Sequence, residues 1–145
     1  MLNKAKLLRQ YKNLDVESQV FSATPHKRVS LLYEGAIRFT RQARLALENR
    51  NYEAKGVNTS RLMDIVSSLR AGLDHEKGGE LSRQLDAIYA FILKHALDAS
   101  KELDVQKYRD IEDVLGILKD GWDNMPEKYR MLDDGALEKL RAEAG

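Results

Sequence analysis

The sequence predicts an all-α protein, an antiparallel up-down-up-down four-helix bundle with an N-terminal docking segment and a polar C-terminal tail. Apolar residues recur three or four positions apart in four successive segments, which is the spacing of one helix face. The 145 residues include only two prolines, Pro25 and Pro126, and helical periodicity is nearly continuous between them. No segment alternates apolar and polar residues over a length that favours a strand.

The first predicted helix begins at Thr24-Pro25. Threonine can cap free backbone N–H groups, and proline suits the first helical position. Asn49-Arg50-Asn51 interrupts the pattern. The apolar stripe of this helix consists of Val29, Leu32, Tyr33, Ala36, Ile37, Ala43 and Leu47.

Paired glycines, Gly78-Gly79, separate the second and third predicted helices. Glycine pairs favour a turn, and we expect one of the two to adopt a positive φ. The second stripe consists of Leu62, Ile65, Val66, Leu69 and Leu73. The third consists of Leu81, Leu85, Ile88, Tyr89, Ile92 and Ala96.

Asp104 is the expected cap of the fourth helix, which should stop near Asn124 because the residue before Pro126 disfavours helical geometry. Its stripe consists of Tyr108, Ile111, Val114, Leu115, Leu118 and Trp122. Short connections between long amphipathic helices favour antiparallel neighbours. The predicted organisation is an N-terminal segment (1–23), a four-helix bundle (24–124) and a C-terminal tail (125–145).

Composition and motifs argue against several function classes. Cysteine is absent, so disulfides and thiol chemistry are excluded. No apolar run approaches the roughly 18 residues that cross a bilayer, and no apolar stretch follows the basic N-terminus. We therefore expect a soluble, cytoplasmic protein without membrane insertion.

Chemistry-bearing motifs are also missing. The three histidines are far apart and no Glu-x-x-His pair occurs, so no metal site is predicted. Gly78-Gly79-Glu80 lacks the lysine and the preceding strand of a phosphate-binding loop. We predict neither a cofactor nor catalytic activity.

Charge is unevenly distributed along the chain. Lys and Arg outnumber Asp and Glu in residues 1–50, and the reverse holds for residues 51–145. A basic half can bind nucleic acid. However, Arg38, Arg41 and Arg44 have the spacing of a solvated helix face, which acidic helices can compensate in space. We expect no nucleic-acid partner, although a generic helical adaptor or nucleic-acid-associated bundle is the alternative reading.

The aromatic residues leave two interpretations open. Tyr33, Tyr89, Tyr108 and Trp122 lie on apolar stripes, so core packing is the default. The same side chains would also line a groove that receives a partner's apolar residues. Tyr11 and Phe21 precede the bundle and belong to no stripe.

Taken in order, several landmarks resemble the FliS family of flagellin export chaperones. They are Tyr11, Ser22-Ala23-Thr24-Pro25, Leu31-Leu32-Tyr33-Glu34-Gly35-Ala36-Ile37, Leu73-Asp74, Gly78-Gly79-Glu80, Leu81, Leu85, Tyr89 and a last helix ending in Trp122. The family commonly reads LYDGAI where this chain has Glu34 in place of Asp. The resemblance covers roughly residues 11–123.

The resemblance implies a four-helix bundle around which the C-terminal segment of flagellin wraps as short helices, with release at the flagellar type III export apparatus. It also implies secondary contacts with export or regulatory proteins of the flagellum. Tyr11 corresponds to an N-terminal tyrosine whose segment covers part of the groove. From the resemblance we expect the following flagellin-binding residues: Tyr11, Phe21, Leu32, Tyr33, Ile37, Leu85, Tyr89 and Trp122.

Overall fold

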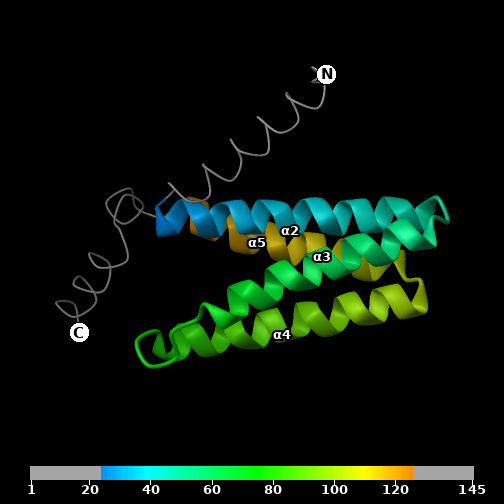
Figure 1. Cartoon of the computed structure of the whole chain (residues 1–145). Coiled ribbons are helices and arrows are strands. Elements are labelled where there is room, and N and C mark those ends of the chain that lie inside the picture. Colours follow the sequence, from blue (N-terminus) through cyan, green and yellow to red (C-terminus); the bar gives the residue numbers. More distant parts are fainter. Residues whose placement is uncertain (1–23, 126–145) are drawn as a thin grey trace, which may run out of the picture. The chain divides into compact units, whose positions relative to one another are not determined.

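Four α-helices make up most of residues 24–125, the part of the chain that the computed structural model describes (Figure 1). They are α2 (Pro25–Glu48), α3 (Tyr52–Ala71), α4 (Gly79–Glu102) and α5 (Val105–Asp123). Each runs back along its predecessor, and none of these described residues is in a strand. The predicted all-α four-helix bundle is confirmed. The expected docking segment and C-terminal tail lie outside the described residues.

The four helices pack together within Leu32–Asn124. Residues 24–31, the first turns of α2, belong to a separate unit, in which Thr24 Oγ1 accepts a hydrogen bond from the Lys27 backbone N–H at 3.2 Å. The predicted division at residues 23/24 and 124/125 stays a prediction. Between residues 24 and 125, no helix has both the length and the apolar character needed to span a membrane.

Short polar side chains fix where the helices begin. Asn51 accepts a hydrogen bond from Ala54 N–H, and Asp104 accepts from the N–H groups of Gln106 and Lys107. These side chains satisfy backbone donors that have no partner inside the helix. Asp104 is therefore the cap predicted from the sequence, and α5 ends at Asp123 beside the expected Asn124.

The connection between α3 and α4 is a tight turn built on two glycines. Gly79 has a φ of +54°, as the sequence predicted for one of the pair. Gly78 has a negative φ, but a Cβ there would lie 1.7 Å from Ser82 Oγ and 2.7 Å from the Asp74 carbonyl oxygen. Ser82 Oγ donates to that same carbonyl at 2.9 Å. Each glycine is needed for a different reason, one for conformation and one for space.

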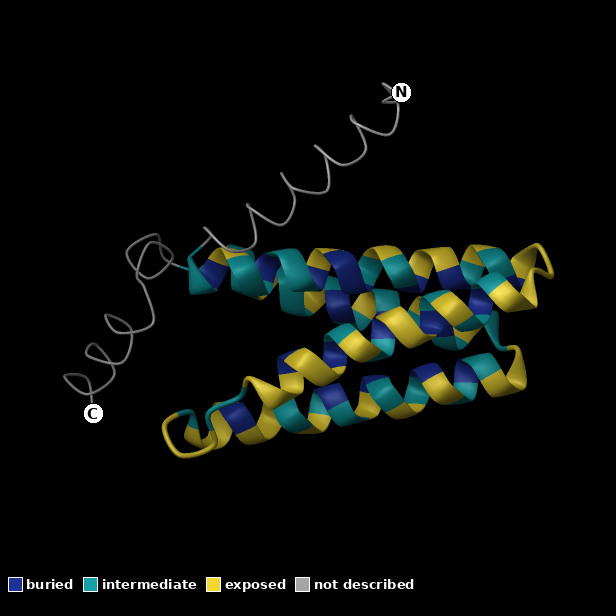
Figure 2. Ribbon diagram, in the orientation of Figure 1, coloured by how far each residue is buried: buried dark blue, intermediate teal, exposed yellow. Residues whose placement is uncertain are grey.

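Core side chains come from all four helices, and Figure 2 shows their buried positions alternating with exposed ones along each helix. Two pairs of hydroxyl groups cross this core. Tyr33 of α2 and Tyr89 of α4 are 2.5 Å apart at their hydroxyl oxygens. Thr59 of α3 and Tyr108 of α5 are 2.7 Å apart. Each pair links helices that are diagonal neighbours in the bundle, so the core holds polar cross-links with satisfied partners.

Two details of the predicted stripes are wrong. Leu73 follows the end of α3 at Ala71, and Leu81 is 63% exposed on the first turns of α4. α3 begins at Tyr52, directly after the predicted break at Asn49-Arg50-Asn51, and its first turns precede the predicted stripe, which starts at Leu62. Its first turns bury Lys55 and Thr59, and Lys55 Nζ donates to the Ser100 carbonyl at 2.8 Å. Polar residues at buried positions hid the helical periodicity from a pattern based on apolar residues.

Candidate binding site

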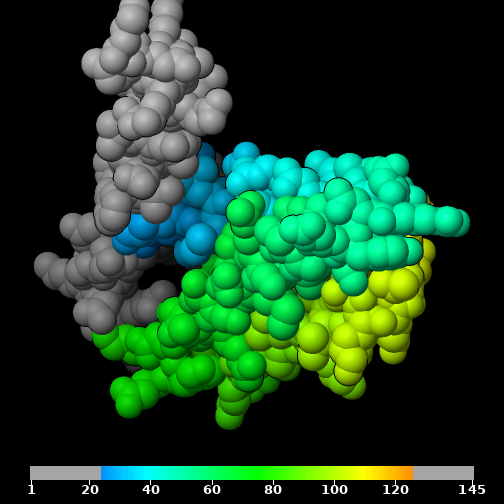
Figure 3. All heavy atoms as spheres, turned by 45° about the vertical axis from the view of Figure 1, so that its right-hand side comes forward, coloured from blue at the N-terminus to red at the C-terminus, as the bar shows by residue number. Residues whose placement is uncertain are grey.

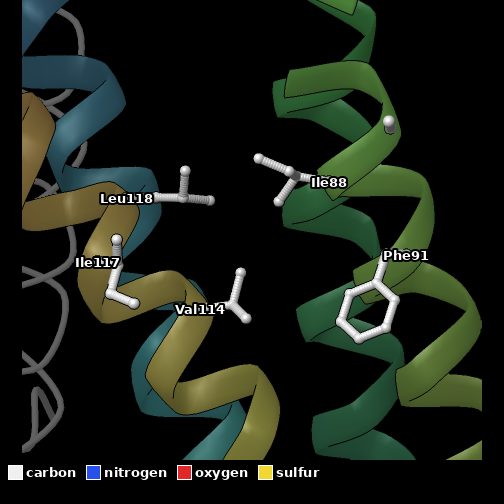
Figure 4. Close-up of a pocket in the computed structure, with 6 residues that line it drawn as sticks. Ile88, Phe91, Val114, Ile117 and Leu118 are labelled. Atoms are coloured by element: carbon white, nitrogen blue, oxygen red, sulfur yellow. The ribbon is translucent and has the colours of Figure 1, made fainter. Parts of the chain in front are cut away.

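An apolar groove of about 410 Å³ lies between α4 and α5. Figure 4 shows Ile88 and Phe91 of α4 facing Val114, Ile117 and Leu118 of α5 across it. Ala87 completes the lining, so no charged side chain lines the groove. We name this surface the α4–α5 groove.

A second apolar row on each helix creates the α4–α5 groove. On α4, Ile88 and Phe91 lie three residues apart beside the buried row that includes Tyr89 and Ile92. On α5, Val114 and Ile117 have the same spacing beside the buried Ile111 and Leu115. A helix that buries one row needs only that row to fold. The second rows are left for the surface, where Phe91 is 48% and Ile117 72% exposed.

The Phe91 ring stacks on His95, and hydrogen bonds of His95 and Asp110 hold that stack in place. Phe91 stacks on His95 with ring centroids 4.8 Å apart and an interplanar angle of 24°. His95 Nε2 lies 3.1 Å from Asp110 Oδ2, and the Gln106 amide donates to Asp110 Oδ1 at 3.0 Å. The hydrogen bonds from Gln106 and His95 lower the pKa of Asp110. These contacts join α4 to α5 and orient one wall of the groove.

Apolar lining determines what the α4–α5 groove can bind. Contiguous exposed apolar surface is uncommon on soluble proteins unless it is an interaction site. A groove between two neighbouring helices can accept the apolar face of an amphipathic helix. The anchor residues of that bound helix recur three or four positions apart. The groove has no group suited to acid–base or nucleophilic chemistry.

A second groove, of about 670 Å³, lies between α2 and α5 and is largely polar. Arg44 Nε donates to Glu112 Oε2 at 2.8 Å, and Arg41 Nε lies 3.4 Å from Glu112 Oε1. Hydrogen bonds from Arg44 to Glu112 and Glu48 raise the pKa of Arg44. Glu112 of the acidic helix α5 thus compensates the positive charge of two of the three arginines on the predicted solvated face, Arg41 and Arg44. The other residues that line this second groove are Ile37, Gln106, Arg109, Asp113 and Gly116.

The structure places two predicted site residues, Tyr33 and Tyr89, in the core. Their exposed fractions are 3% and 2%, and their hydroxyl groups hydrogen-bond to each other. Burial is the main cause that raises the pKa of both, well above the usual range for Tyr33. In this conformation the two side chains belong to the core and present no surface to a partner.

The other predicted residues are distributed over the chain. Ile37 lines the polar groove between α2 and α5. Leu32, Leu85 and Trp122 are partly buried and line neither groove. Tyr11 and Phe21 lie outside the described residues. A role in binding stays a prediction for all eight.

Sequence reasoning missed the exposed members of the α4–α5 groove. Phe91 and Ile117 belong to no predicted stripe, while Ile88, Val114 and Leu118 lie on predicted stripes but were not proposed as site residues. The available signal was the width of the apolar pattern, since α4 and α5 each carry more apolar residues than one core-facing row requires.

Potential metal ligands do not converge in the described part of the chain. Within residues 24–125 there is no group of three or more His, Asp or Glu side chains placed to hold an ion.

Comparisons with known proteins agree with the resemblance found in the sequence. The chain matches the model of a family described as flagellar protein FliS over residues 7–129. It is 34% identical to the flagellar secretion chaperone FliS of Vibrio cholerae, over 86% of this chain and 92% of the relative. It is 32% identical to flagellar secretion chaperone FliSB of Pseudomonas aeruginosa, over 83% and 95%. The flagellar secretion chaperone FliS of Salmonella typhimurium is 34% identical, over 83% and 90%.

Proposed function

The chain belongs to the FliS family of flagellar proteins, and from that premise we propose that it is a cytoplasmic export chaperone for flagellin. In this proposal it binds the C-terminal segment of unpolymerised flagellin, prevents premature assembly and supports delivery to the flagellar type III export apparatus. The family supports an export-chaperone role, because the relatives are named flagellar secretion chaperones. The identity of the cargo and of its bound segment is our inference.

The observation that carries the proposal is the α4–α5 groove. Its apolar lining and the exposure of Phe91 and Ile117 suit the apolar face of an amphipathic helix. A segment that cannot bury its own apolar face stays disordered alone and becomes ordered on binding. Ordering it costs affinity, which a large wrapped surface offsets. Handover can then proceed by competition and needs no nucleotide.

Titration calorimetry with full-length flagellin and with flagellin lacking its C-terminal segment tests the cargo assignment. We expect a 1:1 complex with the full-length protein, because one bundle has the perimeter for one wrapping chain. Binding should be lost with the truncated cargo. Undiminished binding of the truncated flagellin would contradict the proposal.

Substitution of Ile117 tests the site itself. Ile117→Asp puts a carboxylate in an apolar contact, yet the position is 72% exposed, so the bundle should fold normally. The control is Val57→Asp on α3, another exposed β-branched residue outside the groove. We expect flagellin affinity to fall about tenfold or more for Ile117→Asp, the factor that 1.4 kcal/mol produces. Equal affinity of the two variants would place the site elsewhere.

Salt dependence separates this proposal from the alternative of a nucleic-acid-associated bundle. Contacts to phosphates release counterions, so their affinity falls steeply with salt concentration, whereas contacts in an apolar groove are much less sensitive. We expect the affinity for flagellin to change little between low and physiological salt. Secondary contacts with the export apparatus or with flagellar regulatory proteins are a further part of the proposal.

A further inference from the structure

Two guanidinium groups from different helices lie against one phenylalanine ring on the α2–α3 side of the bundle. Arg38 of α2 has its Cζ 5.2 Å from the centroid of the Phe39 ring. Arg61 of α3 has its Cζ 5.7 Å from the same centroid. Both distances are within the range of a cation–π contact. We name these three residues the arginine clamp.

The clamp arginines differ from most others in the bundle. Within the described residues, neither Arg38 nor Arg61 forms an ion pair with a carboxylate, and both side chains are exposed. Five other arginines of Leu32–Asn124 do form such pairs: Arg41, Arg44, Arg70, Arg83 and Arg109. Within the described residues neither guanidinium takes part in a hydrogen bond, so the N–H groups of Arg38 and Arg61 are available to a ligand. The clamp therefore places two cations beside one ring without using their hydrogen-bonding capacity.

We propose that the arginine clamp is a second interaction surface, which binds the carboxylates of an acidic peptide segment in a protein partner other than the groove-bound cargo. Guanidinium groups recognise carboxylates through paired N–H···O hydrogen bonds. Restraint by Phe39 and by the packing of two helices reduces the rotamer freedom that each arginine loses on binding. The clamp needs no change in the core to act.

Local charge favours a short acidic peptide over a nucleic acid. Glu34 lies one helical turn before Arg38, and Asp64 one turn after Arg61. These carboxylates limit the positive potential to the clamp itself. A polyanion needs a run of cations along its backbone. Two cations flanked by acids fit one or two carboxylates instead.

The clamp and the α4–α5 groove lie on opposite sides of the bundle. α2 neighbours α3, since Ile65 lies 3.2 Å from the Cβ position of Gly35, and it neighbours α5 through Arg44 and Glu112. α4 contacts both α3 and α5. The helices therefore follow one another around the bundle (Figure 1), and the side chains of α2 and α3 form one continuous surface (Figure 3). A helix bound in the α4–α5 groove therefore does not contact the clamp.

Nuclear magnetic resonance of the full, ¹⁵N-labelled chain tests this surface, with a short polyglutamate peptide as the probe. We expect the Nε–Hε signals of Arg38 and Arg61 to shift on titration, and the shifts to weaken with added salt. Arg38→Gln and Arg61→Gln should each lower the affinity roughly two- to fivefold, the range for one exposed ion pair. The matched control is Arg83→Gln on α4, which removes an exposed arginine from the other side of the bundle and should leave peptide affinity unchanged.

Three outcomes would overturn the assignment of the clamp. They are the absence of shifts at Arg38 and Arg61, an equal loss of affinity in Arg83→Gln, and preferential binding of a single-stranded oligonucleotide over polyglutamate. Ile117→Asp should bind the peptide like the unmodified chain. A failure of the flagellin proposal is therefore distinguishable from a failure of this one.

Discussion

Gly78 and Gly79 are adjacent, yet the structure requires glycine at the two positions for different reasons. Gly79 has a φ of +54°, a conformation that a side chain with a Cβ rarely adopts. Gly78 has ordinary backbone geometry but no room for a Cβ against Ser82 and the Asp74 carbonyl. A change at Gly79 strains the backbone, whereas a change at Gly78 displaces the hydrogen bond that closes the turn.

We therefore expect Gly79→Val and Gly78→Ala each to lower the free energy of unfolding by about 1 kcal/mol or more. Gly56→Ala is the control, because a Cβ at that helical position meets nothing within 4 Å. It should leave stability unchanged or raise it by up to about 1 kcal/mol through helix propensity. Urea unfolding measures all three. Unchanged stability in Gly78→Ala would mean that Ser82 moves aside freely.

The paired hydroxyl groups of Tyr33 and Tyr89 make stability sensitive to alkaline pH. Burial raises the pKa of both, and also that of Tyr108, above the ordinary value near 10 that the unfolded chain retains. At high pH the unfolded state therefore loses protons first. The contribution of these groups is fully present below the unfolded pKa and declines as pH rises toward the folded values.

We predict that the free energy of unfolding falls as pH rises above about 10. The double substitution Tyr33→Phe/Tyr89→Phe should make this slope shallower and change stability little at neutral pH, because both hydrogen-bonding partners are removed together. Tyr33→Phe alone leaves a buried hydroxyl without its partner and should cost about 1–3 kcal/mol. Urea unfolding at a series of pH values checks both parts. An unchanged slope in the double variant would show that other groups titrate.

At the scale of the element, α5 is the helix on which both grooves depend. One side of it contributes Val114, Ile117 and Leu118 to the α4–α5 groove. The other side contributes Glu112, which binds Arg41 and Arg44 of α2. Asp110 also affects the α4–α5 groove, because it pairs with His95, and His95 stacks on the Phe91 ring that lines the groove.

We expect His95→Ala to weaken the binding of flagellin's C-terminal segment about two- to tenfold, because an aromatic stacking contact contributes about 0.5–1.5 kcal/mol. Asp86→Asn provides the matched control. It breaks the Arg70–Asp86 pair, a 2.7 Å contact between α3 and α4 away from the groove. Asp86→Asn loses only an exposed ion pair, whereas His95→Ala also loses the stacking contact, so binding is compared after the stability of each variant has been measured. Equal binding losses in calorimetry would show that any helix–helix cross-link matters and that the Phe91 wall has no special role.

For the whole molecule, the bundle within Leu32–Asn124 contains the paired hydroxyls, the ion pairs between helices and both grooves. Tyr11 precedes this unit in the sequence, so its ring should not be needed to fill the bundle core. The resemblance implies that its segment competes with flagellin for the groove and adds contacts once displaced.

Removing residues 1–18 should therefore leave the unfolding temperature of the bundle unchanged and alter flagellin affinity or association rate. A segment that docks with about 1–2 kcal/mol weakens apparent affinity about five- to thirtyfold, because only the open state binds. Affinity rises on truncation when this competition dominates and falls when the added contacts dominate. Thermal unfolding and titration of the truncated chain give the result. Loss of the fold would show that residues 1–18 stabilise the bundle. No change in either the unfolding temperature or the binding of flagellin would show that the segment does not compete for the groove.

The sequence by itself determined the helices, because their physical causes are local. Thr24, Asp104 and the glycine pair act within a few residues, and apolar spacing identifies the face that each helix buries. The same landmarks identified the family, since their order and separation are properties of the chain. Where buried residues are polar, as at Lys55 and Thr59, the apolar stripe does not extend over the first turns of the helix.

Only the tertiary structure decided which side chains form the candidate site. Tyr33 and Phe91 are both aromatic residues on helices, yet one is buried against Tyr89 and the other is half exposed beside Ile117. Helical periodicity gives the angle of a side chain around its own helix but not the identity of the helix that faces it. Burial, the groove and the contact of Arg61 with Phe39 all arise where two helices pack against each other, and packing alone sets those distances.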